Sequence, residues 1–434
     1  MLNKIIKNYF FVLFSLIPIS LVLGSTVSLI NILLIDIIFL FILIYEKNFL
    51  FVKNNAIKCF LVLYIYLVFN SFISVDHSVG LARNLGFLRI IILFIAMNYF
   101  FKDQKFFQKV LTIWSIIFII ILIDVFIEII LGRNILGYES PYRRRIVSFF
   151  KDEPIVGGYL NAFYLIIIGF LYSKFGKNFK KPILIISILA IIGILLTGER
   201  ANFIKAFLGI ILFYSFFDLY KIKHKFYFLT IVTIFISGFI FSNDFLKNRY
   251  IDQMKSLLLD NRIYYDQYRS GYKVFKEYKF FGVGNKNYRI VSCSKFEEEA
   301  NKWIDIIGKP SDVFGQDGYE ADFFIREYVE YRCNTHPHQI YLELLSEHGI
   351  LGTIFILYII YKLIISKFIF SLKSMNYIQL GSGIYIIFIF LPLVPSGAFF
   401  SDFLITLFAL NVSIFYASNS NLNIFSNDDY NKKI

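Results

Sequence analysis

Charged residues are scarce in this chain of 434 residues, and their scarcity argues against a soluble globular protein. Only 17% of the residues are charged, whereas 57% are hydrophobic, and phenylalanine alone contributes 53. A chain of this composition has lipid as the solvent for much of its surface. A cleavable signal peptide is not expected either, because the first apolar stretch is long, lacks a small-residue cleavage site and is followed at once by a second stretch.

We expect about twelve membrane-spanning helices, since a spanning helix needs about 20 mostly apolar residues. The predicted fold class is therefore an all-α polytopic membrane protein. The apolar stretches fall at 5–23, 27–45, 56–74, 84–101, 108–131, 155–173, 182–197, 201–217, 226–242, 340–365, 378–396 and 402–417. The expected domains are spans one to nine in 1–242, one large and mainly helical periplasmic loop in 243–338, spans ten to twelve in 339–417, and a cytoplasmic tail in 418–434.

Arginine is absent before Arg83 and after Arg332. Lysines follow the even-numbered spans, and because cytoplasmic loops collect positive charge, both termini are expected in the cytoplasm. The arginines then lie on the outer face, where membrane topology does not explain them. Guanidinium groups bind phosphates and carboxylates bidentately, so this distribution predicts an anionic, phosphate-bearing ligand. The other interpretation, a misassigned loop around the arginines at 143–145, would break the lysine pattern at several neighbouring spans.

The loop at 243–338 is too long for a plain connector. Arg262 and Arg269 are seven residues apart and share one face of an expected helix, so the two side chains could grip one pyrophosphate. The alternative is a solvated face with salt bridges to neighbouring carboxylates. The following glycines at 282–284 predict a tight turn whose backbone can approach a ligand.

The middle of this loop is acidic and carries two cysteines. Its carboxylates lack the alternating spacing of a calcium loop, so we expect no metal. Cys293 and Cys333 flank the acidic stretch on the expected oxidising side of the membrane. The sequence leaves open whether they form a disulfide.

The loop ends in His336-Pro337-His338-Gln339, which enters the next span. Pro337 suits the first turn of a helix, which would place His338 in that turn. The helix dipole disfavours imidazolium there, and a neutral ring can accept a proton near pH 7. One of the two histidines is therefore a candidate base, and the other would orient it or bind phosphate. The alternative is that both residues only cap the helix entry.

Charged residues also occur in the short turn 197–200 between two apolar runs, where charge is costly and usually functional or paired. Glu199 could neutralise Arg200, but neighbours in sequence point to different sides, which favours an Arg200 that faces a polar cavity. Asp152 and Glu153 precede the sixth span. Their carboxylates would bind sugar hydroxyls or pair with the arginines at 143–145.

In this order, the elements resemble the O-antigen ligase and O-antigen polymerase superfamily, bacterial envelope glycosyltransferases of the membrane-bound C type. The turn 197–200 looks like the family's short arginine turn, and Arg262 with the glycine turn 282–284 is similar to its loop arginine. The histidine motif resembles the family's, except that Gln339 stands where asparagine is usual. The segment 391–397 resembles its late proline break.

The resemblance implies transfer of a glycan from undecaprenyl diphosphate to an acceptor hydroxyl on the periplasmic face of the bacterial inner membrane. It implies no nucleotide sugar, no cofactor and no metal, and inversion at the anomeric carbon. Under it, His338 or His336 would be the catalytic base, and the diphosphate ligands would be Arg200, Arg262 and Arg269. The expected contacts with the acceptor or the glycan are Asp152, Glu153, Arg144 and Gln339.

The paired histidines favour a ligase, whose acceptor is the lipid A core, over a polymerase, whose acceptor is a second lipid-linked glycan. A transporter or flippase of an anionic or lipid-linked substrate is the alternative from another class, although only Asp36 is placed to suggest a relay within a span. A purely structural membrane protein would explain neither the arginine distribution nor the histidine pair. Membrane lipid is an expected partner, and nucleic acid is not.

Overall fold

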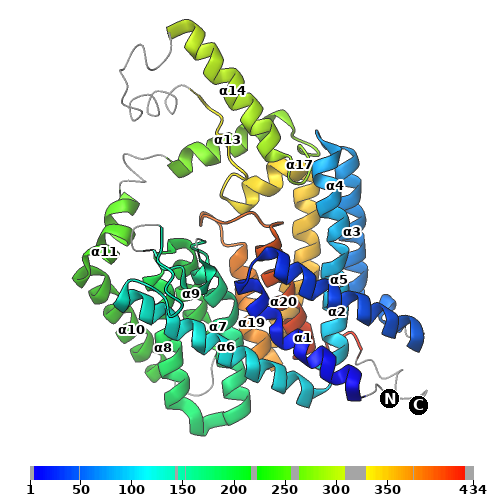
Figure 1. Ribbon diagram of the computed structural model, residues 1–434, viewed down its shortest axis with the longest axis vertical. Helices are drawn as coiled ribbons and strands as arrows, with labels where there is room; N and C mark the ends of the chain where they lie inside the picture. Colours follow the sequence, from blue (N-terminus) through cyan, green and yellow to red (C-terminus); the bar gives the residue numbers. More distant parts are fainter. Residues whose placement is uncertain are drawn as a thin grey trace.

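The structure is a computed structural model that describes residues 4–47, 49–141, 145–151, 153–216, 222–255, 263–307, 329–374 and 376–425. All regular secondary structure in these ranges is helical, which confirms the all-α prediction. Figure 1 shows a body of many helices and a smaller lobe above it, to which α13 and α14 belong. The body places the connections that carry the candidate site.

The helices of the first part of the body are α1 (Lys4–Val22), α2 (Ser25–Glu46), η1 (Leu50–Lys53), α3 (Asn55–Phe72), α4 (His77–Gly86), α5 (Leu88–Phe101), α6 (Gln104–Leu131), η2 (Ser148–Phe150), α7 (Val156–Phe175), η3 (Gly176–Phe179), α8 (Lys180–Leu196), α9 (Arg200–Ser215) and α10 (Ile222–Ser242). The remaining helices are α11 (Asp244–Lys247), η4 (Asn248–Asp252), α13 (Ile263–Glu277), α14 (Tyr288–Ile307), α17 (Ile340–Ile360), η5 (Tyr361–Ile365), α18 (Ser366–Ser374), α19 (Tyr377–Ile389) and α20 (Asp402–Ala417).

Each of the predicted spans coincides with helical structure, but only eight helical stretches in the described ranges are long and apolar enough to cross a membrane. The other positions hold α8, α9, α19 and α20, which have 17, 16, 13 and 16 residues. At 1.5 Å per residue, such helices extend roughly 20–26 Å, less than the roughly 30 Å of a hydrocarbon core. The protein is a polytopic membrane protein, and the expected number of about twelve spans is not confirmed.

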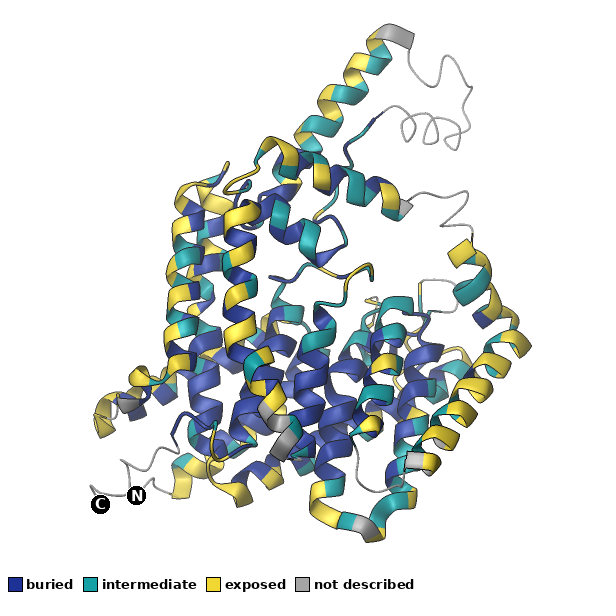
Figure 2. Ribbon diagram, turned by 180° about the vertical axis from the view of Figure 1, so that it is seen from behind, coloured by how far each residue is buried: buried dark blue, intermediate teal, exposed yellow. Residues whose placement is uncertain are grey.

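Helix α7 forms the centre of the body, where Figure 2 shows mostly buried residues. Glycines let α19 approach it closely: a Cβ on Gly169 would lie 2.4 Å from the carbonyl oxygen of Tyr377, and one on Gly381 would lie 2.5 Å from that of Leu165. Small residues serve this purpose throughout membrane proteins. Because these pairs run antiparallel, the start of α7 lies at the same end of the body as the residues that follow α19.

All the described arginines lie at that same end of the body, which we call the arginine end. It includes the segments 23–24, 73–87, 132–141, 145–151, 153–155, 197–199, 243–255, 263–307, 329–339 and 390–401. At the opposite end, an ion pair of 3.4 Å between Lys7 and Asp103 joins the start of α1 to the turn before α6. This arrangement agrees with the topology that we predicted from the lysines and arginines.

The lobe consists of α13, the turn 278–287, α14 and the segment 329–339. It has a small hydrophobic core of Val274, Val283, Tyr288, Val291 and Tyr331. A disulfide between Cys293 and Cys333 joins α14 to the segment 329–339. The possibility that the sequence left open for these cysteines is thus decided in favour of the bond. The acidic residues at 308–328 lie outside the described ranges.

The lobe docks on a kink of α17 through main-chain hydrogen bonds. The N–H group of Val283 donates to the carbonyl oxygen of Ser346 (2.9 Å). The kink lies at Gly349, whose φ is +64°. A Cβ on Gly282 would lie 2.3 Å from the carbonyl carbon of Glu347, so only glycine fits there. The close approach that we expected this glycine turn to make to a ligand is made to the protein's own helix.

Alanine at Gly282 or Gly349 is expected to destabilise the docked lobe. Both residues have positive φ, at +71° and +64°, and each added Cβ would lie 2.3 Å from a main-chain carbon atom. We expect the free energy of unfolding to fall by about 3 kcal/mol or more, which thermal unfolding of the purified protein would report. Gly137→Ala is the matched control, because Gly137 has a φ of +85° but no atom within 4 Å of its Cβ position. An equal loss in the control would contradict the importance of the close approach.

Candidate active site

The turn between α8 and α9 is organised by Glu199, whose carboxylate is bound by the start of α7 and by Asn202. Its oxygens accept hydrogen bonds from the N–H groups of Gly157 (2.6 Å) and Gly158 (3.1 Å) at the start of α7, and from the side chain of Asn202 (2.6 Å). Burial raises the pKa of Glu199 to about 7. A Cβ on Gly157 would lie 2.9 Å from the Glu199 carboxyl carbon, so the sequence keeps this approach open with glycine. No ion pair within 4.0 Å joins Glu199 to Arg200, and whether Arg200 faces a polar cavity stays a prediction.

Three guanidinium groups gather beside this turn, those of Arg145, Arg200 and Arg249, which we call the arginine cluster. Arg249 Nε donates to the carbonyl oxygen of Gly198 (3.0 Å). Burial, and then the charges of Arg200 and Arg145, lower the pKa of Arg249. Repulsion of this kind shows that the three positive charges lie within electrostatic reach of one another.

No ion pair within 4.0 Å joins the arginine cluster to a described residue, although the charge of Arg145 opposes the rise in the pKa of Glu199. Two of its nitrogen atoms, Arg200 Nη1 and Arg145 Nε, are buried without a hydrogen-bond partner. Buried cations without a counter-ion are unfavourable. The cluster is therefore suited to bind an anion with several oxygen atoms.

Two buried carboxylates of α6 position the segment that carries Arg145. Glu128 accepts hydrogen bonds from the N–H groups of Val147 (3.1 Å) and Ser148 (2.6 Å), and Asp124 accepts one from the Ser148 hydroxyl. Asp124 and Glu128 are four residues apart and so share one face of α6. These carboxylates serve as anchors for a loop rather than as ligands.

The other predicted arginines and carboxylates have different positions. Arg262, Arg144 and Asp152 lie outside the described ranges. Arg269 lies in α13, where it donates to the carbonyl oxygen of Val329 (3.1 Å) and lies 3.8 Å from Asp266. Both contacts are within the lobe, so the salt-bridge alternative that we considered for Arg269 is the arrangement observed.

The two predicted histidines are in contact, with ring centroids 4.1 Å apart. His336 Nε2 lies 3.2 Å from the carbonyl oxygen of Ser396, which can only accept, so Nε2 must carry the proton. Nδ1 then accepts from the hydroxyl of Thr335 (2.9 Å). Burial and the neighbouring His338 hold the pKa of His336 at about 3. His336 is therefore a neutral ring whose two nitrogen atoms are both occupied.

His338 differs from its neighbour because no described residue hydrogen-bonds to its ring. Burial lowers the pKa of His338, so this ring too is neutral near pH 7. Its backbone is held in the left-handed region at φ +54°, and its carbonyl oxygen accepts from the N–H of Ser396 (2.9 Å). A neutral imidazole with a free nitrogen, held by its own main chain, can accept a proton from a ligand.

Helix α17 begins after Pro337 and His338, which we had predicted to lie in its first turn. Helix α17 begins at Ile340, and Gln339 is its N-cap, with a side-chain oxygen that accepts from the N–H of Leu342 (2.7 Å). His338 thus precedes the first turn, and burial rather than the helix dipole is the leading cause of its lowered pKa. Because the Gln339 side chain is engaged in capping, its oxygen serves the helix and not a glycan.

An activity that uses His338 as a base should tolerate mild acid. Because burial lowers the pKa of His338, the ring should stay neutral as the pH falls through about 6.5, the ordinary value for histidine. The acid limb of kcat/KM should therefore lie below about pH 6.5, in a profile measured from about pH 4 to about pH 8. Since an unfolded chain would bind protons first, stability also declines as the pH falls below about 6.5. Samples returned to neutral pH must regain full activity, and a limb centred above about 6.5 would contradict a buried base.

The arginine cluster, the histidine pair and the helical body define a class of protein. It is a polytopic membrane protein whose arginine cluster and histidine pair lie at the same end of the body. Residues 185–357 match the family model for O-antigen ligase, and this segment includes Arg200, Arg249, His336 and His338. This part of the chain is therefore similar to the O-antigen ligase family. No curated protein and no solved structure matches the chain.

Proposed function

We propose that the protein transfers a glycan from undecaprenyl diphosphate to a hydroxyl of the lipid A core, on the periplasmic face of the bacterial inner membrane. The observation that carries this proposal is the arginine cluster, which is half-buried, forms no ion pair within 4.0 Å with a described residue, and contains two buried nitrogen atoms without a hydrogen-bond partner. A diphosphate supplies the charge and the oxygen atoms that three guanidinium groups can bind. Arg200 keeps its expected role as a diphosphate ligand, and Arg249 and Arg145 take the places beside it.

An apolar groove near the arginine cluster could bind the polyprenyl tail of the donor lipid. It lies between α8, α9 and α10, has a volume of about 230 Å³ and is lined by residues such as Ile191, Phe207, Val232 and Phe235. Phe207 follows Arg200 by seven residues on α9, about 10 Å along the helix axis. A lipid with its diphosphate at the cluster could thus place its tail in this groove.

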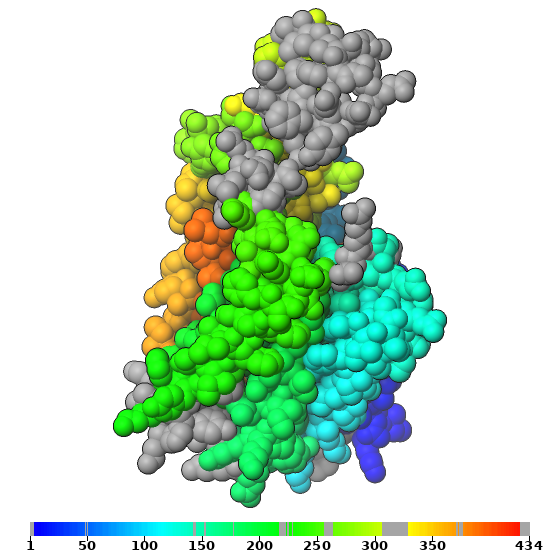
Figure 3. Space-filling model, turned by 90° about the vertical axis from the view of Figure 1, so that its left-hand side faces the viewer, coloured from blue at the N-terminus to red at the C-terminus, as the bar shows by residue number. Residues whose placement is uncertain are grey.

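The outer wall of the groove is α10. It is the least buried of the candidate spans, since only 6% of its residues 225–242 are buried. Figure 3 shows the green side chains of this region in front of the other helices. The groove therefore lies at the edge of the body, where a lipid can enter from the bilayer.

The reaction follows from the two groups of residues. His338 takes the proton of the acceptor hydroxyl, and the oxygen forms a bond to the anomeric carbon of the donor sugar. The bond from that carbon to the diphosphate breaks, and its electron pair leaves with the diphosphate, where the arginine cluster stabilises the charge. Direct attack of this kind inverts the anomeric centre. The proposed reaction requires neither a metal nor a cofactor, because the positive charges and N–H donors of the guanidinium groups stabilise the leaving diphosphate.

A polymerase is the second candidate, because the same residues would serve a second lipid-linked glycan as acceptor. The test is transfer by the purified protein from undecaprenyl-diphosphate-linked glycan, with the lipid A core offered as acceptor and a chelator in a parallel sample. Glycan on the core, unaffected by the chelator, supports the ligase. Longer lipid-linked chains would make the protein a polymerase. No transfer from a donor that a known ligase accepts would overturn the proposal and favour a transporter.

A further inference from the structure

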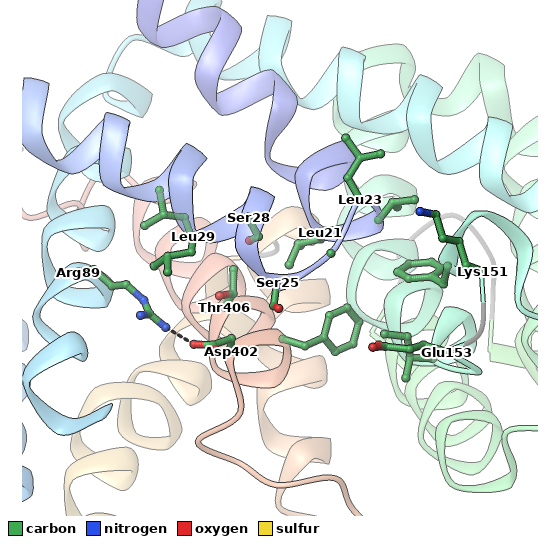
Figure 4. Close-up of a pocket in the computed structure, with 16 residues that line it drawn as sticks. Leu21, Leu23, Ser25, Ser28, Leu29, Arg89, Lys151, Glu153, Asp402 and Thr406 are labelled. Carbon is green, nitrogen blue, oxygen red and sulfur yellow. Dashed lines mark hydrogen bonds and ion pairs between the residues drawn. The ribbon is translucent and has the colours of Figure 1, made fainter. Parts of the chain in front are cut away.

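A second pocket lies at the arginine end, between the α1–α2 turn, the start of α5, the segment 150–155 and the start of α20 (Figure 4). We call it the side pocket. Its volume of about 240 Å³ is far above the roughly 10–15 Å³ that a single water needs. Every residue that lines it lies outside 185–357, the segment matched by the O-antigen ligase model.

The side pocket is lined by two basic residues, Arg89 and Lys151, and by two acidic residues, Glu153 and Asp402. Asp402 accepts from both Arg83 and Arg89, and Lys151 and Glu153 lie across the pocket from this group (Figure 4). The hydroxyl side chains of Ser25, Ser28 and Thr406 and the rings of Phe150 and Phe403 complete the lining. Paired charges, hydroxyls and aromatic rings suit a neutral ligand with many hydroxyl groups better than a phosphate.

Two polar atoms in the side pocket lack a partner. Ser28 is 4% exposed, and its hydroxyl is buried with no hydrogen bond to a described residue. Arg89 Nε is likewise buried and unpaired, although the other end of its guanidinium binds Asp402. In Figure 4, Ser28 points into the same space as Ser25 and Thr406. Unsatisfied buried polar atoms of this kind indicate a ligand that supplies the missing hydrogen bonds.

The side pocket is flanked by segments that lead to both parts of the candidate active site. In the connection between α19 and α20, the N–H of Ser396 donates to the carbonyl oxygen of His338, and the N–H of Phe399 donates to the carboxylate of Glu343. This connection leads to Asp402 at the start of α20. On the other side, Phe150 and Lys151 continue the segment that begins at Arg145. Leu23, at the α1–α2 turn, also lines the side pocket and is 63% exposed, so the pocket has an apolar surface residue at its edge.

We propose that the side pocket binds a sugar of the membrane-anchored acceptor, and so selects the acceptor glycolipid. The inference rests on the proposed function and deepens it, because it names the residues that recognise the second substrate. Ser28, Thr406 and Arg89 supply the hydrogen bonds, and the ring of Phe150 or Phe403 covers an apolar sugar face.

The test is a kinetic comparison of the Ser28→Ala/Thr406→Val double variant and of Arg89→Lys with the wild type. Lysine keeps the ion pair with Asp402 but removes Nε. We expect the KM for the acceptor to rise at least tenfold, with the KM for the donor and kcat within about twofold. Ser15→Ala is the matched control, because Ser15 is also buried with an unpaired hydroxyl but lies in α1 outside the side pocket. A change in the donor KM, a change in kcat alone, or an equal effect in the control would overturn the proposal.

A binding experiment separates failure of the side pocket from failure of the proposed function. Delipidated core oligosaccharide is added to the protein in a detergent without a sugar headgroup, and saturation-transfer NMR reports contact. Signals that the double variant loses support a saccharide site even if no transfer occurs, which would count against the proposed function alone. Equal signals in wild type and variant, or displacement of the saccharide by inorganic phosphate, would overturn the side-pocket assignment.

Discussion

His338→Ala is expected to lower kcat for glycan transfer about 10²–10⁴-fold, the usual contribution of a positioned general base. The His338 ring is neutral and has no hydrogen-bond partner among the described residues, so its removal leaves no buried donor or acceptor unsatisfied. Its backbone, not its ring, holds Ser396. The variant should therefore fold and bind both substrates, and the loss should appear in kcat rather than in KM. Initial rates at saturating donor and acceptor provide the measurement.

The control for this variant is His77→Ala, which removes an exposed histidine at the same end of the molecule. Its rate should stay within about twofold of the wild type. Added imidazole should restore part of the rate of the His338 variant, because the small base can occupy the vacated space. A His338→Ala protein with near-normal kcat would exclude this residue as the base and leave His336, whose ring nitrogens are both occupied, as a poor substitute.

Arg200→Lys and Arg249→Lys are each expected to lower kcat/KM for the donor by about 10²-fold or more, the cost of removing one group that stabilises developing charge. Lysine keeps the positive charge but lacks the planar fork that binds a diphosphate through two parallel hydrogen bonds. For Arg249 the substitution also removes the bond from Nε to the Gly198 carbonyl oxygen, so part of its loss reflects the shape of the turn. Arg200 makes no such bond to a described residue through Nη1, and its loss reports on the ligand alone.

Arg133→Lys is the matched control, since Arg133 is an exposed arginine of the arginine end that lies outside the cluster. Donor kinetics in this variant should match the wild type. Competition by inorganic pyrophosphate should weaken in the Arg200 and Arg249 variants and stay unchanged in the control. If Arg200→Lys turns over normally and pyrophosphate still competes, the diphosphate lies elsewhere.

The helices were predictable from the sequence because each apolar run is bounded by polar residues, and in a membrane a long apolar run has few alternatives to a helix. The lengths of α19 and α20 were less predictable. The run 378–396 reads as one span, but Pro392 and Pro395 end helix structure after Ile389, and the remaining residues form the connection to α20. Hydropathy alone does not register such a break.

The site was predictable where chemistry is local and was missed where it depends on tertiary contacts. Arg200 and the histidine pair could be identified because a charge between apolar runs and a histidine at a helix entry are unusual in themselves. Arg249 carries no such signal, since it is one of several arginines in a polar loop. Its position beside the turn 197–200 becomes clear only from the tertiary structure, where it donates to the carbonyl oxygen of Gly198. The side pocket draws on four distant segments, and no pattern in the sequence joins them.

The docking of the lobe on α17 also limits which changes the protein can accept over evolutionary time. The contacts between them run largely through peptide groups, as in the bond from Val283 to Ser346 and the bond from Ile350 to Lys279. Peptide groups are the same whatever side chains they carry, so substitutions on the outer surface of the lobe leave its register on the body intact. The outer surface of the lobe can therefore vary while the histidines that follow it keep their place. At the contact itself, the glycines are fixed, as are Asn285 and Asn287, whose side chains bond to Asn84 and to the N–H of Asp76.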